Sequence, residues 1–380
     1  MPITKPERHE ATFMTTTTTN SYMVTNRTDP TSGSQSPLSG SALWWYLSPN
    51  PKDQNPDNFV NQSTSPSSTP PATFSDAITA QLQAMSRPSL TVFVHGLDCL
   101  WVPSAVTKTN AVMYTGLLGQ NLANAGYGGL VIGFSWPSNG PLDALQYADG
   151  YPPTVPASGW DARGNILRSV DSFAALFRWI AQLAAGFSQS GSSLEVNLVC
   201  HSEGNFMLMC AATAGALSAG AINQVVMLAA DINDAAFQVP ATGLTGQAAA
   251  IATCAQLVTI YSSTNDPILA DSIEYYTTFH NPSYPGRLGL SGPSYPANQQ
   301  SNAVGVDCSA VVNGTYVDQL PTSIWPPNTS LHVAYFYIPQ VLQDITQTLL
   351  GTAPADVSNR SANPPANPPV GSYTMNPLPG

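Results

Sequence analysis

Ser202 is the residue whose surroundings in the sequence best suit a nucleophile. It lies in "VNLVCHSEGNFMLMCAA" (196–212), where an apolar run that predicts a buried strand is followed by small and apolar residues that predict a helix. A nucleophilic serine at such a strand-to-helix turn needs small residues two positions to either side. Gly204 provides one, whereas Cys200 replaces the glycine expected before the serine. The alternative is a serine that only caps a buried helix.

A serine hydroxyl becomes a good nucleophile only when a base takes its proton and an acid orients that base. The sequence contains five histidines, and two of them are placed to reach the turn. His332 follows the last predicted strand and precedes the terminal helix, so we expect it to be the base. His280, between the last two predicted strands, is the alternative.

The acid should follow a strand close to Ser202 and lie between the serine and the histidine in sequence. Asp266 ends "QLVTIYSSTND", which reads as a strand followed by a turn. Asp231 and Asp234 follow the preceding strand and are the alternatives, and a turn aspartate can also be purely structural. The order Ser202, Asp266, His332 is that of a hydrolytic triad in an α/β enzyme.

Acyl transfer passes through a negatively charged oxygen, which backbone N–H groups can stabilise. The strand "TVFVHG" ends at Gly96, which allows close approach of the backbone, so the Leu97 amide is one expected donor. The Glu203 amide, at the start of the helix after Ser202, is the other, because the helix dipole favours negative charge there.

These residues depend on an alternation of predicted strands and helices. The alternation indicates an α/β fold with a mostly parallel central sheet and helices on both faces, in which ligands bind at the carboxyl ends of the strands. Strands are expected at 89–96, 129–138, 194–200, 222–231, 255–263 and 305–312, and helices at 74–85, 110–126, 165–187, 204–217 and within 331–350. Ser75 or Asp76 is the expected cap of the first of these helices.

Composition excludes several functions. Charged residues make up only 9% of the 380, and the net charge is −11, so no basic surface is available for nucleic acid. The five cysteines have no metal-ligand spacing and are expected to be mainly buried thiols, although one disulfide is possible. The proposed chemistry needs no metal or organic cofactor. The uncharged stretch 205–230 is expected to be a buried helix and strand rather than a membrane span.

Three regions are expected along the chain. Residues 1–72 are rich in Thr, Ser, Pro and Asn and should be mostly irregular, with Trp44 and Trp45 docking on the main domain. Residues 73–350 form the catalytic domain, and residues 351–380 form a Pro-rich extended tail. The first residues lack the apolar core of a signal peptide, which favours the cytoplasm, with export by a leaderless route as the alternative.

The chain resembles the α/β-hydrolase superfamily, and within it a bacterial group of largely uncharacterised serine hydrolases. The stretches that carry the resemblance are "VFVHG", "IGFSWPSNG", "LVCHSEGN", "VVMLAADIND", "VTIYSSTNDPIL" and "LHVAYFYIPQVLQDI". The resemblance implies the α/β-hydrolase fold, with Ser202 as nucleophile, Asp266 as acid and His332 as base.

The expected activity is hydrolysis of carboxylic esters, with short-to-medium-chain or aryl esters favoured. The substrate is therefore a small or polymeric ester, and the oligomeric state is left open. A lipase or polyester depolymerase is a close alternative, and a non-catalytic surface-binding module on the same scaffold is a different one. Aromatic residues in two long loops are expected to line the substrate pocket: Tyr147, Tyr151, Trp160 and Trp325.

Overall fold

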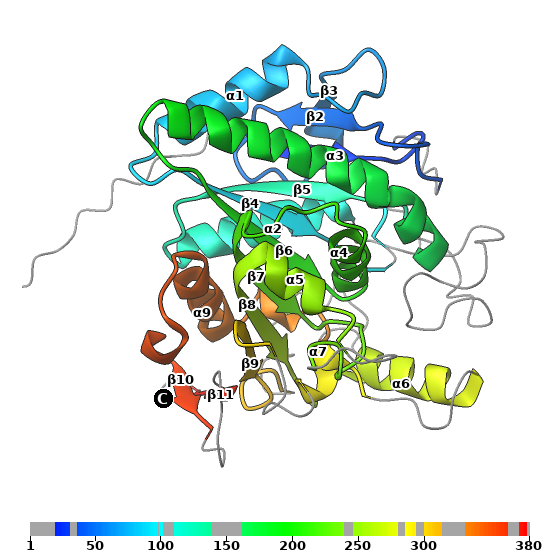
Figure 1. Ribbon diagram of the computed structural model, residues 1–380, viewed down its shortest axis with the longest axis vertical. Coiled ribbons are helices and arrows are strands. Elements are labelled where there is room, and N and C mark those ends of the chain that lie inside the picture. Colours follow the sequence, from blue (N-terminus) through cyan, green and yellow to red (C-terminus); the bar gives the residue numbers. More distant parts are fainter. Residues whose placement is uncertain are drawn as a thin grey trace, which may run out of the picture.

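Apolar runs rich in Val, Ile and Leu form the centre of one large sheet, as expected for strands buried on both faces. The computed structural model (Figure 1) describes residues 20–30, 36–97, 99–101, 110–138, 162–238, 246–279, 286–293, 300–313, 331–363 and 372–377. Its central strands are β4 (Ser89–Val94), β5 (Leu130–Ser135), β6 (Glu195–His201), β7 (Ile222–Leu228), β8 (Ala255–Ser262) and β9 (Ala303–Asp307). Neighbours within this group are all parallel.

Both ends of the chain add strands to this sheet, for which the sequence had suggested largely irregular structure. The strand order is β10-β11-β9-β8-β7-β6-β4-β5-β1-β2-β3. The added strands are β1 (Ser21–Thr25), β2 (Trp44–Ser48), β3 (Val60–Asn61), β10 (Arg360–Ala362) and β11 (Ser372–Met375). β1 is parallel to β5, and Trp45 of β2 packs edge-on against Phe74 and Trp179. These contacts hold the N-terminal strands on the main sheet.

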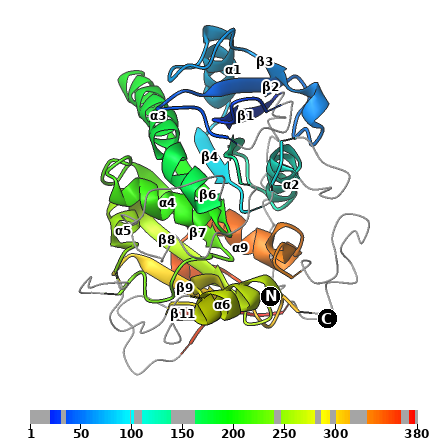
Figure 2. The same cartoon turned by 90° about the vertical axis from the view of Figure 1, so that its right-hand side faces the viewer.

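Helices cover both faces of the sheet. On one face, buried side chains of α1 (Ala72–Gln83), α3 (Ala162–Gln189), α4 (Gly204–Thr213) and α5 (Ala249–Cys254) form one core with the strands. The other face is covered by α2 (Ala111–Asn124) and α9 (Pro339–Leu349), as Figure 2 shows, and their buried side chains form the second core with the strands. The other helices of the described residues are α6 (Pro267–Phe279), α7 (Leu288–Ser291) and the 3-10 turns Pro56–Asn58, Ala334–Phe336 and Pro354–Asp356.

The start of α1 differs from the expectation. The helix begins at Ala72, directly after Pro71, and neither Ser75 nor Asp76 caps it. Pro71 has an extended backbone (φ −64°, ψ 153°), and its carbonyl oxygen accepts the first bonds of the helix, from the Phe74 and Ser75 N–H groups at 3.1 Å each. The helix therefore begins after Pro71, three residues before the expected cap Ser75.

The uncharged stretch 205–230 divides between α4 and β7, both of them buried. Within the described residues, no helix is both long and apolar enough to cross a membrane. All five cysteines are buried free thiols.

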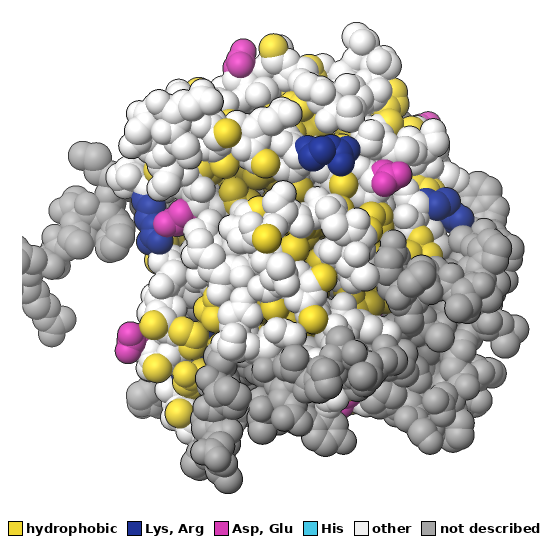
Figure 3. Space-filling model, in the orientation of Figure 1, with side chains coloured by type: hydrophobic (Ala, Val, Ile, Leu, Met, Phe, Trp, Pro, Cys, Tyr) yellow, Lys and Arg dark blue, Asp and Glu magenta, His cyan; other side chains and the backbone are white. Residues whose placement is uncertain are grey.

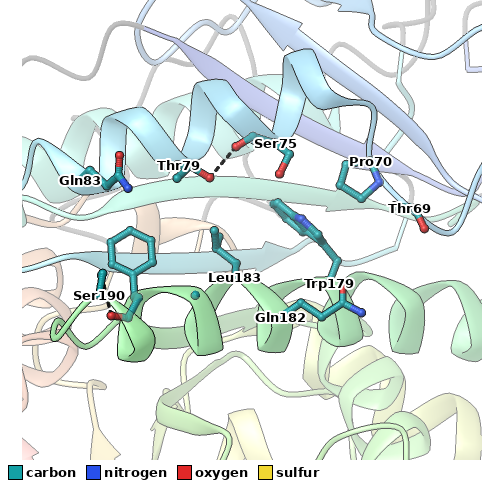
Figure 4. A pocket seen from close by; sticks show the side chains of 11 residues that line it. Thr69, Pro70, Ser75, Thr79, Gln83, Trp179, Gln182, Leu183 and Ser190 are labelled. Atoms are coloured by element: carbon teal, nitrogen blue, oxygen red, sulfur yellow. Dashed lines mark hydrogen bonds between the residues drawn. The ribbon is translucent and has the colours of Figure 1, made fainter.

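A groove of about 440 Å³ lies between α1 and α3 (Figure 4). Trp179 and Leu183 of α3 contribute its apolar part, while Thr79 and Gln83 of α1 contribute polar groups. None of the residues predicted to act on a substrate lines this groove.

Candidate active site

Ser202 lies in the turn between the end of β6 at His201 and the start of α4 at Gly204. Its φ is 53°, in the left-handed region that residues with a side chain rarely adopt. The turn is fixed by two backbone bonds, from the Ser202 N–H to the Leu228 carbonyl and from the Asn205 N–H to the Ser202 carbonyl, each 3.0 Å. Strain of this kind is concentrated at functional sites.

Two glycines make room for this turn. A Cβ on Gly204 would lie 2.6 Å from the Val94 carbonyl oxygen and 2.8 Å from that of His95, so α4 begins directly against the end of β4. A Cβ on Gly96 would lie 2.7 Å from Ser202 Cβ and 3.2 Å from Ser202 Oγ. Both positions therefore require a residue without a side chain.

Cys200 occupies the place where a glycine was expected, one residue before the end of β6. Its side chain is fully buried among the residues of the core that includes α1, α3 and α4. Burial also raises the pKa of this thiol well above its ordinary value of 9.0. Cys200 is therefore a core residue and is unsuited to act as a thiolate nucleophile.

Asp266 and His332 are in direct contact, with 2.7 Å between Asp266 Oδ2 and His332 Nδ1. Asp266 precedes α6, and its other oxygen, Oδ1, accepts bonds from the amides of Ile268 (3.1 Å) and Leu269 (3.2 Å). The carboxylate is thus fixed by the helix end on one side and faces the imidazole on the other. This arrangement places the proton on His332 Nδ1 and leaves Nε2 free to accept one.

His201 holds the loop that carries His332, a role that the sequence did not suggest. Its Nε2 is 2.9 Å from the His332 carbonyl oxygen, and the two rings are 4.7 Å apart. Burial, and then the charge of His332, lower the pKa of His201 well below 6.5, so its ring is neutral and Nε2–H is the donor. Since His201 directly precedes Ser202, this bond links the serine turn to the His332 loop.

The pKa of His332 is raised above its ordinary value of 6.5. Burial by itself lowers this pKa, but the Asp266 carboxylate raises it through its charge and its hydrogen bond, and the charge of Asp231 adds to this. An imidazolium formed at this position is therefore stabilised.

The alternative acid Asp231 has partners other than His332. Among the described residues, Asp266 is the carboxylate hydrogen-bonded to His332. Asp231 forms an ion pair with Arg287, 2.9 Å from Nε to Oδ1, and accepts a bond of 2.8 Å from Ser272. His280 lies outside the described residues.

His95 fixes the loop that follows β4 and carries the Leu97 amide. His95 Nδ1 donates to the Gly96 carbonyl at 2.8 Å, and His95 Nε2 accepts from the Trp136 N–H at 3.3 Å. In a trans peptide the N–H points away from the preceding carbonyl, so the Leu97 N–H points away from His95. Within the described residues this N–H has no acceptor. Glu203, the other expected donor, is the residue before α4, and its side chain is buried.

The four aromatic residues predicted to contact a substrate, Tyr147, Tyr151, Trp160 and Trp325, lie outside the described residues. Of the described residues, no group of three or more His, Cys, Asp or Glu is arranged to hold a metal ion.

The chain was compared with proteins of known structure, with curated proteins and with family models. Similar solved structures include a cutinase-like protein from Cryptococcus sp., with 13% sequence identity over 70% of this chain and 94% of that chain and a TM-score of 0.30. Esterase B from Lactobacillus Rhamnosis is 10% identical over 71% of this chain and 80% of that chain, with a TM-score of 0.27. A third is phospholipase PlaB from Legionella pneumophila, which is 11% identical over 76% of this chain and 67% of that chain, with a TM-score of 0.28. No curated protein matches the chain.

A family model described as "Alpha/beta hydrolase of unknown function (DUF900)" matches residues 71–307, which is more than half of the chain. The match includes Ser202 and Asp266 and ends before His332. It confirms the α/β-hydrolase fold predicted from the sequence. The chain therefore belongs to this family of alpha/beta hydrolases.

Proposed function

We propose that the protein hydrolyses carboxylic esters with Ser202 as nucleophile, His332 as general base and Asp266 as the acid that orients the base. The observation that carries this proposal is the buried contact of 2.7 Å between Asp266 and His332. His332 lies on a loop whose backbone is hydrogen-bonded to His201, the residue before the strained turn at Ser202. A nucleophile after β6, an orienting acid after β8 and a base before α9 suit acyl transfer.

In the proposed reaction, His332 Nε2 takes the proton of Ser202 Oγ as that oxygen attacks the ester carbonyl. The imidazolium is stabilised by Asp266, and it then gives its proton to the leaving alcohol. Water repeats the cycle on the acyl-enzyme and releases the carboxylic acid. No hydrogen bond joins Ser202 Oγ to His332 in the described residues; such bonds commonly tighten only when substrate is bound.

The negative oxygen of the intermediate would accept bonds from the Leu97 and Glu203 amides. Support comes from the Leu97 N–H, which has no acceptor among the described residues, from the closeness of Gly96 to Ser202 and from the position of Glu203 directly before α4. These donors are held by backbone, so they need little reorganisation during the reaction.

Short-to-medium-chain or aryl esters are the proposed substrates. This part rests on the aromatic residues of the two long loops, Tyr147, Tyr151, Trp160 and Trp325, which suit an apolar acyl or aryl group. A series of p-nitrophenyl esters of increasing acyl length would identify the preferred chain, and long-chain or polymeric esters would identify a lipase or polyester depolymerase.

The decisive test is covalent labelling with a fluorophosphonate, which reacts with activated serines. Wild-type protein should be labelled at Ser202 and should hydrolyse at least one p-nitrophenyl ester. Ser202→Ala should lose both reactions while it unfolds at the wild-type temperature. A folded wild-type protein that is neither labelled nor active would contradict the proposal and favour a binding module on the same scaffold.

A further inference from the structure

Arg27 is a fully buried arginine in the segment that follows β1, and it joins two loops at the carboxyl ends of the strands. Its Nε donates to Ser135 Oγ at 3.1 Å, and its Nη2 donates to the carbonyl oxygens of Cys99 and Trp136, each at 2.5 Å. Ser135 is the last residue of β5 and Trp136 follows it, whereas Cys99 lies in the loop after β4 that also contains Leu97. One guanidinium thus connects the β5 end to the proposed oxyanion loop.

The backbone behind Arg27 is itself fixed, so the guanidinium is not on a loose chain end. Thr25 Oγ1 donates to the Ser135 carbonyl at 2.7 Å and accepts from the Arg27 N–H at 3.2 Å. Asn26 Nδ2 donates to Ser169 Oγ of α3 at 2.7 Å. The parallel pairing of β1 with β5 adds regular backbone bonds.

Arg27 and His95 hold the oxyanion loop on either side of Leu97. His95 fixes the Gly96 carbonyl, and Arg27 fixes the Cys99 carbonyl. The two side chains also share Ser135 Oγ, which is 3.3 Å from His95 Nε2. Burial, and then the charge of Arg27, lower the pKa of His95 to about 3, so its ring stays neutral and keeps its bond to Gly96.

We propose that Arg27 is a positioning residue for catalysis, which fixes the Leu97 amide in the orientation that a negatively charged oxygen requires. Arg27 lies outside residues 71–307, so an essential support of the site comes from a segment that the family model does not cover. The inference rests on the proposed function of Ser202 and Leu97. A positioning role of Arg27 differs from a purely structural one, because loss of Arg27 would weaken binding of the transition state and leave binding of the substrate unchanged.

The test compares full-length wild-type protein with the Arg27→Met and Arg27→Lys variants. For each protein, kcat and KM are measured with p-nitrophenyl butyrate, and binding is measured for phenylboronic acid, an inhibitor that mimics the tetrahedral intermediate. Arg178→Met is the matched control, because Arg178 is an exposed arginine of α3. Arg27→Met should lower kcat about 10- to 100-fold, less than the roughly 100- to 1,000-fold for loss of a whole donor. KM should change less than twofold, and boronate affinity should fall with kcat.

Arg27→Lys should recover part of the lost kcat, since an ammonium can still bond one or two of the three acceptors. Arg178→Met should behave as wild type. A folded Arg27→Met with wild-type kcat, or with raised KM and unchanged kcat, would overturn the inference.

If Arg27→Met does not fold, Ser135→Ala decides the question, because it removes one partner of Arg27 and leaves the guanidinium in place. It should lower kcat in the same direction by a smaller factor, and an unchanged kcat would overturn the inference. Fluorophosphonate labelling separates the two proposals: labelled wild type with unaffected variants refutes only the role of Arg27, whereas unlabelled wild type refutes the proposed function and this inference with it.

Discussion

Gly96 decides how much room the side chain of Ser202 has. Gly96→Ala would place a Cβ 2.7 Å from Ser202 Cβ, so the serine or the oxyanion loop must move. We expect ester hydrolysis to fall on the order of 100-fold, as misplacement by about 1 Å can cause. Gly128→Ala, where the added Cβ meets nothing within 4 Å, should leave the rate unchanged. Equal rates of hydrolysis by the two variants would contradict this prediction.

The contact between Asp266 and His332 predicts a pH dependence. His332 acts as a base only when it is neutral, and its pKa is raised above 6.5, so wild-type kcat/KM should rise with pH through that raised value and then level off. Asp266→Asn should lower kcat by about 10⁴-fold, as in other triads.

Asp266→Asn should also shift the pH at which activity rises, and the direction follows from what sets the pKa of His332. Without the Asp266 charge, burial lowers this pKa, so the residual activity of Asp266→Asn should begin to rise at a lower pH than wild-type activity. A pH–rate profile of both proteins checks this, and a shift of the acid limb to higher pH would be inconsistent with it.

The sequence predicts the contacts of some site residues and not those of others. The pairing of Asp266 with His332 follows from chain order, because consecutive parallel strands bring their carboxyl ends to one edge. Arg27 and His201 could not be found in this way. Their roles depend on burial and on contacts with backbone carbonyls far away in the sequence, for which a single arginine or histidine gives no local signal.

At the scale of elements, the position of α4 depends on Gly204. A Cβ there would overlap the carbonyls of Val94 and His95, which are backbone atoms and cannot rotate away. We expect Gly204→Ala to destabilise the fold by about 2 kcal/mol through overpacking. Activity should fall as well, because the Glu203 amide moves with the helix.

Gly186→Ala in α3 is the matched comparison, since its added Cβ meets nothing within 4 Å. Here the higher helix propensity of alanine should stabilise the protein by about 0.5–1 kcal/mol. Urea unfolding measures both variants, and the same sign for the two would argue against the proposed packing role of Gly204.

The central elements were predictable because their patterns are local. The strands β4 to β9 are apolar runs, and the residues of α3 chosen by helical spacing, such as Ile166, Phe173 and Ile180, are buried. By contrast, β1, β10 and β11 are short and rich in Ser and Thr, and their pairing depends on partners far along the chain. No periodicity within five residues distinguishes such strands from irregular chain.

For the molecule as a whole, the C-terminal segment is held by Arg360. This arginine forms a buried ion pair with Asp344 of α9 and also bonds Tyr261 of β8 at 3.2 Å. We expect Arg360→Met to cost about 3–5 kcal/mol, because it leaves the Asp344 charge buried without its partner. Arg87→Met breaks the solvent-exposed pair with Glu195 and should cost less than about 1 kcal/mol.

Urea unfolding again compares the two substitutions directly. Similar losses of stability in Arg360→Met and Arg87→Met would show that the C-terminal strands contribute little to the folded state. A large loss confined to Arg360→Met would show that the described C-terminal strands are an integral part of the sheet.

The surface carries few charges. In the view of Figure 3, lysine, arginine and acidic side chains are few and scattered, and at the left edge a basic group lies beside an acidic one. Among the described residues, Val60 is the exposed large hydrophobic side chain. Charged groups therefore form only a small part of the described surface on this face.

The lengths of the outer strands have a consequence for self-association. β3 has two residues and β10 has three, and they are the shortest strands that the structure describes. An approaching chain could form few backbone bonds with such edges, so they are poor templates for aggregation. Charge repulsion between molecules weakens in acid as carboxylates are protonated, whereas a short edge stays short at every pH at which the protein is folded.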